Sequence, residues 1–185
     1  MEKSEAGCLG KNDIDDIEKI KKIDFNTSGI KILGIHLSQN KEYMTKYNFD
    51  RVFQKFQAVL SMWKMRNLTL YGKVQVVRSL AMSQLLYVCS KLPVPKTFTT
   101  KVEKEIVRFV WNGRKPKIKY KTLIGDINEG GIGLPDLETI IQTNRVGWFV
   151  KLKNDTKDYW QVFADNYLEK YGGFKNIGEN FNLSI

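Results

Sequence analysis

Apolar residues recur at helical spacing along much of the chain. Two long sets follow one another, with members mostly three or four positions apart: Phe49, Val52, Phe53, Phe56, Val59, Leu60 and Trp63, then Val74, Val77, Leu80, Ala81, Leu85 and Val88. This spacing places apolar side chains on one face of a helix. The pattern therefore predicts two helices, joined across residues 67–72 into a helical hairpin.

Capping and breaking residues predict where these two helices begin and end. Asn48 is expected to cap a first helix over residues 49–65, and Thr69 a second helix over residues 70–91. Both side chains carry an oxygen that can accept a hydrogen bond from the first amides of a helix. Pro93 stops the second helix, because proline cannot continue the hydrogen-bond ladder.

Three further helices are expected downstream. Thr100 begins a sequence with capping-box spacing, so a third helix is expected to start there. It is expected to end at Asn112, since the glycine that follows suits a left-handed cap. The remaining two are expected over residues 136–152 and 156–171, and a short helix is also compatible with residues 13–22.

Other segments are predicted to be extended or irregular. Residues 30–37 are rich in branched residues and are expected to form a strand, with Gly34 at a bulge or close approach. Residues 38–46 are expected to form a loop, and residues 114–121 an extended basic arm or edge hairpin. The glycines of 130–135 indicate a turn, because a phosphate-binding loop would also need Lys followed by Ser or Thr.

Together these elements predict a mainly α fold, a helical bundle with a short N-terminal strand and the basic arm. The expected organisation is a polar N-terminal segment over 1–29, a helical domain with a basic face over 30–122, a helical connection region over 123–171 and a loosely ordered tail over 172–185.

Positive charge is concentrated in one segment of the chain. Residues 51–121 hold 16 Lys and Arg against 2 Asp and Glu, a net charge of +14, whereas the rest of the chain has a net charge of −4. A continuous basic segment is typical of proteins that bind a polyanion, and nucleic acid is the first candidate. A solvated surface, or a face that docks on an acidic protein, is the alternative.

Nine cations in this segment are the candidate nucleic-acid-binding residues: Lys64, Arg66, Lys73, Arg78, Arg114, Lys115, Lys117, Lys119 and Lys121. Most cations fall between the apolar positions of the pattern and are therefore expected to project outward. Phosphate contacts of this kind hold a duplex without reading its sequence.

Three other residues near this segment have two interpretations each. Gly72 can let backbone amides approach a phosphate or allow tight packing against the preceding helix. Trp63 and Trp111 can stack on bases, but their helical spacing favours a role as core anchors.

No complete active site is apparent. Asp15 and Asp16 resemble the metal-binding pair of a polymerase, yet polar, helix-forming residues follow them, so a solvated helix start explains the pair better. His36 lies in the strand-like run and is expected to be structural. Neither a metal nor a cofactor is expected.

The cysteines and the apolar stretches bear on location. Cys8 and Cys89 lack the spacing of a disulfide framework or zinc site, which favours a reducing, intracellular compartment, either nucleus or cytoplasm. The N-terminus lacks the apolar run of a secretory signal, and no apolar stretch approaches the length of a membrane span.

An ordered series of short motifs between residues 30 and 153 resembles a known family. The motifs are KILGIHL, WKMRNLTLYGKVQVVRSL, SQLLYV, LPVP, FVWNG, KIKYKTLI and GGIGLPDLE. In this order they resemble the region downstream of the palm in reverse transcriptases of non-LTR (LINE-type) retrotransposons. The segment SEAGCLG, residues 4–10, resembles the junction between the palm and that region.

The resemblance implies a thumb and the connection that follows it. A thumb packs against the primer–template duplex, so the implied partners are RNA, DNA or hybrid duplex and the palm and fingers of the same polyprotein. The family's catalytic aspartates would precede residue 1. The chain is therefore expected not to be an enzyme by itself, but part of an RNA-directed DNA polymerase.

Overall fold

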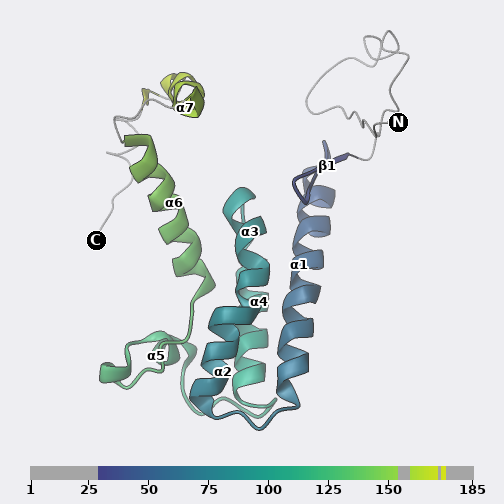
Figure 1. The fold of residues 1–185 in the computed structure, drawn as a ribbon, viewed down its shortest axis with the longest axis vertical. Coiled ribbons are helices and arrows are strands. Elements are labelled where there is room, and N and C mark those ends of the chain that lie inside the picture. Colours follow the sequence, from purple (N-terminus) through teal and green to yellow (C-terminus); the bar gives the residue numbers. More distant parts are fainter. Residues whose placement is uncertain (1–28, 154–158, 171, 174–185) are drawn as a thin grey trace. The chain divides into compact units, whose positions relative to one another are not determined.

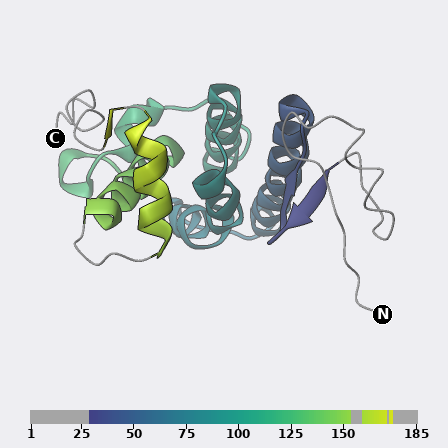
Figure 2. The ribbon, with the colours of Figure 1, turned by 90° about the horizontal axis from the view of Figure 1, so that it is seen from above.

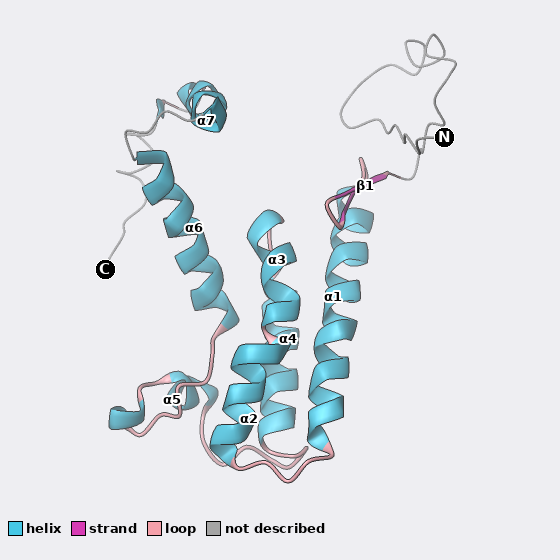
Figure 3. Cartoon of the chain, viewed as in Figure 1, coloured by secondary structure: helices cyan, strands magenta, loops and turns pink. Residues whose placement is uncertain are grey.

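The computed structural model describes residues 29–153, 159–170 and 172–173. These residues are mainly helical (Figure 3), so the predicted fold class is confirmed. The chain forms two compact units that divide between Ile141 and Gln142. The predicted helix over 13–22, with Asp15 and Asp16, lies outside the described residues, as does Cys8.

The strand predicted over 30–37 is a hairpin. Strand β1 (Ile30–Ile32) pairs antiparallel with β2 (Ile35–Leu37), and Ile32 faces Ile35. The two turn residues, Leu33 and Gly34, have φ of 47° and 84°. Positive φ at both positions characterises the tight turns that suit twisted strands. Gly34 therefore serves the turn, and neither a bulge nor a close approach requires it.

The first long helix begins earlier than predicted. Helix α1 (Lys41–Lys64) is capped by Asn40, whose side chain accepts a hydrogen bond from Tyr43 N. The predicted loop over 38–46 is confirmed only for residues 38–40, and the predicted cap at Asn48 is wrong. The first two turns of α1 bury no side chain before Asn48, so the apolar pattern starts two turns after the helix does.

The second helical run follows the prediction closely. Helix α2 (Leu70–Val76), the π-helical turn η2 (Val77–Ala81) and α3 (Ser83–Lys91) form one run. Thr69 caps it through its hydroxyl, which accepts from Gly72 N at 3.1 Å. In the π turn, Met82 N donates to Val77 O at 2.9 Å. The widened turn lets the adjacent residues Ala81 and Met82 both enter the core.

Helix α4 (Lys96–Val110) starts at a proline rather than at the predicted capping box. Pro95 occupies the N-cap position, and its carbonyl accepts from Phe98 N at 2.9 Å. Thr100 lies inside the helix and donates its hydroxyl to Lys96 O. The predicted end is confirmed: Asn112 has a left-handed φ of 53°, and Gly113 N reaches back to Arg108 O at 2.7 Å.

The basic arm predicted over 114–121 is not a hairpin. Residues 114–119 form no strand, and residues 120 and 121 belong to the short helix α5 (Tyr120–Ile124). A 3-10 turn, η3 (Ile127–Glu129), follows it. The last two helices, α6 (Leu137–Lys153) and α7 (Tyr159–Glu169), correspond to the two predicted downstream.

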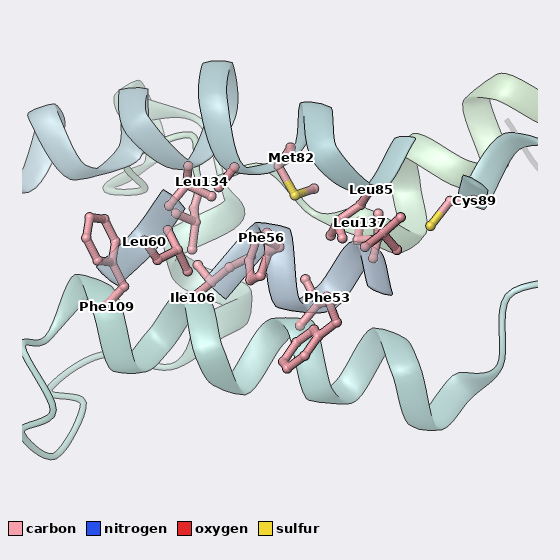
Figure 4. Packing of buried hydrophobic residues seen from close by; sticks show 14 of the residues in the cluster. Phe53, Phe56, Leu60, Met82, Leu85, Cys89, Ile106, Phe109, Leu134 and Leu137 are labelled. Atoms are coloured by element: carbon pink, nitrogen blue, oxygen red, sulfur yellow. The ribbon is translucent and has the colours of Figure 1, made fainter. Parts of the chain in front are cut away.

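Helix α1 packs against both α3 and α4, and α2 and η2 complete the bundle around the core (Figure 1, Figure 2). The buried cluster takes side chains from α1, α2, η2, α3 and α4. Figure 4 shows Phe56 of α1, Leu85 of α3 and Ile106 of α4 among them. Leu123, Leu134, Leu137 and Ile141 complete the same buried cluster. The segments after α4 are therefore part of the core of the bundle up to Ile141.

Among the described residues of the second unit, one is buried. Gln161 of α7 is buried, and its Nε2 donates to Lys151 O of α6 at 2.8 Å. The rings of Trp148 and Trp160 meet edge to face at 5.9 Å. Within the described residues, no helix is both long and apolar enough to span a bilayer.

Candidate nucleic-acid interface

The cations of the basic segment lie mainly at the surface. Of the 16 Lys and Arg residues in 51–121, all except Arg51 and Lys73 are exposed. Two of the 16 form ion pairs with described carboxylates: Lys101 with Asp50 at 3.8 Å, and Arg108 with Glu105 at 3.2 Å. None of the nine candidate cations has a carboxylate partner within the described ranges. Eight of the nine, all except Lys73, are exposed and present their charge to the solvent.

Two of the candidates meet at one end of the bundle. Lys64 ends α1 and Arg66 lies in the connection to α2, at the end where α4 also finishes (Figure 1). Both line an open pocket of about 350 Å³ together with Asn67, Leu68, Thr69, Lys73 and Asn112. The Arg66 guanidinium also lies 4.8 Å from the ring centroid of Trp63.

Lys73 does not project outward as predicted. Lys73 is only 7% exposed. Its ammonium donates hydrogen bonds to Val110 O at 2.9 Å and to Asn112 Oδ1 at 2.8 Å. Burial lowers its pKa because desolvation disfavours the charged form. The ammonium thus ties α2 to the last carbonyls of α4. Position 73 lies one helical turn before the buried Val77, on the same side of the helix, and the apolar pattern alone did not reveal this.

Arg78 also has a structural contact. Its side chain is exposed, and Nη2 donates to Gly133 O. This bond holds the loop that precedes α6 against the π turn. A guanidinium has five N–H donors, so the contact leaves others for an anion.

The remaining five candidates, Arg114, Lys115, Lys117, Lys119 and Lys121, are all exposed. Tyr120 anchors this segment by packing against the buried cluster. Its pKa is raised, first by burial and then by the carboxylates of Asp136 and Glu103. A fixed tyrosine therefore holds a short run of outward lysines close to the bundle.

The tryptophans follow the core-anchor interpretation. Trp63 and Trp111 are partly buried and pack against the core cluster. Within the described residues, neither indole N–H has a hydrogen-bond acceptor. Both lie at the ends of α1 and α4, near the pocket end of the bundle.

Close packing does not explain Gly72. A Cβ added there would meet its nearest neighbour, Thr69 Oγ1, at 3.4 Å, which is an ordinary contact. The neighbouring atoms belong to the capping residues Leu68 and Thr69 rather than to α1. The prediction of tight packing against the preceding helix is wrong, and the prediction of phosphate approach stays untested.

His36 and Cys89 both have surroundings typical of structural residues. His36 lies between the rings of Tyr43 and Tyr47, at centroid distances of 5.6 and 4.7 Å. Burial raises the pKa of the Cys89 thiol to about 12, so it is protonated at neutral pH and a poor nucleophile. The described residues contain no group of three or more His, Cys, Asp or Glu that could hold a metal.

The pocket contains polar residues that sequence reasoning missed as ligands. Asn67, Thr69 and Asn112 line it beside the cations. Thr69 and Asn112 were recognised as helix caps, and their pocket role follows only from the way the ends of α1, α2 and α4 converge. No spacing in the sequence links residue 112 to residues 64–73.

Comparison with known proteins relates the chain to a transposon protein. No protein-family model matches the chain. Over 168 residues, 26% are identical to the transposon TX1 uncharacterized 149 kDa protein of Xenopus laevis. The chain is similar to a transposon protein. The match covers 89% of this chain but 12% of that protein's length. This distant similarity supports the transposon origin implied by the motifs, without identifying the region's role.

Proposed function

We propose that the chain is the thumb region of a non-LTR retrotransposon reverse transcriptase and binds the backbone of a primer–template duplex. The observation that carries this proposal is the set of exposed cations without carboxylate partners in the described ranges. The helical bundle, the ordered motifs and the transposon similarity support it.

The proposed contacts are electrostatic. Exposed lysines and arginines neutralise phosphates and release condensed counterions, so affinity falls steeply with salt and depends little on base sequence. Some of the candidate cations donate no hydrogen bond to another part of the described structure. They include Lys64, Arg66 and the lysines of 115–121. The palm and fingers of the same polyprotein would supply the catalytic carboxylates, so the chain alone would bind duplex without extending a primer.

Salt dependence of duplex binding tests the proposed face. The triple variant Lys64→Gln, Arg66→Gln, Lys115→Gln is expected to lower the magnitude of the slope of log K against log salt by roughly 2 to 3, because each lost phosphate contact removes about 0.9. Fluorescence anisotropy with an RNA/DNA hybrid from 50 to about 300 mM salt measures this slope.

A matched control removes the same charge elsewhere. Lys31, Lys41 and Lys46 are exposed at the hairpin end of the bundle, and their triple change to Gln is expected to leave the slope within about 1 of the original chain. Equal slopes for the two triple variants would show that net charge, rather than this face, governs binding.

The same cations would also suit an acidic protein surface, so the ligand must be compared directly. A duplex-binding face should prefer an RNA/DNA hybrid over an unstructured acidic peptide of equal charge, since only the duplex presents phosphates at fixed spacing. Tighter binding of the peptide would favour a protein-docking role. Primer extension by the purified chain with magnesium and nucleotides would contradict the expectation that it is not an enzyme alone.

A further inference from the structure

The ammonium of Lys73 is a buried cation with only neutral acceptors. Its two hydrogen bonds go to a backbone carbonyl and an asparagine amide oxygen. The ring centroid of Phe109 lies 5.9 Å away. Within the described residues, no carboxylate pairs with it. A buried charge without an opposite charge is costly, and proteins normally pair it.

The open pocket beside this ammonium could hold an anion that balances its charge. Lys73 lines it with the exposed cations Lys64 and Arg66, and Asn67, Thr69 and Asn112 supply polar edges. A lysine ammonium has three N–H donors, and two are used here. The pocket therefore contains three positive charges and no carboxylate among its lining residues. Its volume of about 350 Å³ exceeds the needs of one phosphate group.

We infer that this pocket binds a single phosphate group. The buried ammonium of Lys73 would be its counter-ion inside the pocket, and the exposed side chains of Lys64 and Arg66, called the rim residues here, would contact it from the outside. The inference deepens the proposed function, on which the choice of a nucleic-acid phosphate as ligand rests. It distinguishes one defined anion site from the general attraction of the basic surface. Lys64 and Arg66 then bind in a fixed geometry, while the lysines of 115–121 remain diffuse contacts.

Ligand-dependent thermal stability tests the site in the full 185-residue chain. Inorganic phosphate is expected to raise Tm by about 4 °C at ten times its Kd, compared with sodium chloride of equal ionic strength. The variant Lys64→Gln, Arg66→Gln should lose most of this shift. The control Lys96→Gln, Lys104→Gln removes two exposed charges of α4 outside the pocket lining and should keep it.

Lys73→Met tests the buried charge. It replaces the aliphatic part of the side chain with one of similar length and removes the ammonium. The phosphate-dependent shift in Tm is expected to disappear while the helix content of the folded chain remains. If Lys73→Met does not fold, the double variant Lys64→Gln, Arg66→Gln still tests the site. A chain with equal Tm in phosphate and chloride, or a shift that survives in the rim variant, would overturn the inference.

Two sources of phosphate are separated by competition. A 5′-phosphorylated oligonucleotide that displaces inorganic phosphate about tenfold better than its 5′-hydroxyl form would assign the pocket to a terminal monoester, and equal displacement would assign it to backbone diesters. Displacement by neither would overturn a nucleic-acid ligand. If the original chain binds duplex with the expected salt dependence but does not bind inorganic phosphate, the phosphate site is wrong and the proposed function stands. If it binds phosphate but no duplex, the proposed thumb function is wrong.

Discussion

At the scale of single residues, Asn48 has the most instructive environment. This residue of α1 is only 3% exposed. Its Oδ1 accepts a hydrogen bond from His36 N at 2.9 Å, and its Nδ2 donates one to His36 O at 2.7 Å. In the hairpin, His36 faces Lys31, and the Asn48 amide bonds both the backbone N–H and the C=O of His36. The amide of one asparagine satisfies both groups, as a neighbouring strand would.

This environment predicts a large effect of a small substitution. Asn48→Ala is expected to lower the free energy of unfolding by about 2 to 3 kcal/mol, because it removes three hydrogen bonds made by a buried amide, two of them to His36 and one to Met44. Urea denaturation followed by circular dichroism measures the loss, and faster hydrogen exchange at the His36 amide would locate it. Gln54→Ala, at an exposed position of the same helix, should change stability by less than about 0.5 kcal/mol. Similar losses for both variants would contradict this role of Asn48.

At the scale of elements, two glycines show which segments are tightly fitted. Gly72 in the first turn of α2 has room for a methyl group. Gly131, in the loop between η3 and α6, has none, because an added Cβ would overlap the backbone carbonyl of Gly125. Gly133 N also donates to Gly125 O at 3.1 Å. The glycine-rich loop is thus a close-packed turn, as predicted, rather than a phosphate loop.

The two glycines should respond oppositely to alanine. Gly72→Ala is expected to leave stability unchanged or raise it by up to about 1 kcal/mol, because alanine is the better helix former. Gly131→Ala is expected to cost more than about 2 kcal/mol, since two backbone segments must separate. Thermal denaturation of both variants measures the difference. A Gly72→Ala chain that is stable yet binds duplex more weakly would instead support amide contact with phosphate at α2.

At the scale of the whole molecule, the bundle's core draws on segments far apart in the chain. Leu137 and Ile141, 3% and 6% exposed, join the cluster formed by α1, α3 and α4. Within the described residues, this cluster contains nothing beyond Ile141. The first turns of α6 are therefore needed by the bundle, although the rest of the helix belongs to the second compact unit.

Two truncations test this division. A chain that ends after residue 153 should keep the stability of the bundle, whereas a chain that ends after residue 135 should lose about 4 kcal/mol, since two buried aliphatic side chains are removed. Comparing their urea midpoints with that of the full chain measures both effects. Comparable midpoints for the two truncations would place the end of the bundle core before α6. The separate division predicted at residue 122 stays a prediction.

The sequence by itself determined the helical character of the chain, the cap at Thr69, the left-handed end of α4 and the glycine turn before α6. These features depend on apolar spacing and on residues whose backbone preferences are local. Only the structure showed the early start of α1, the hairpin of residues 30–37, the inward turn of Lys73 and its meeting with Asn112. The inward turn of Lys73 and its meeting with Asn112 depend on which surfaces pack together, because burial selects among the several local conformations that the same residues allow. The early start of α1 depends instead on the side chain of Asn40, which caps the helix two turns before its first buried residue.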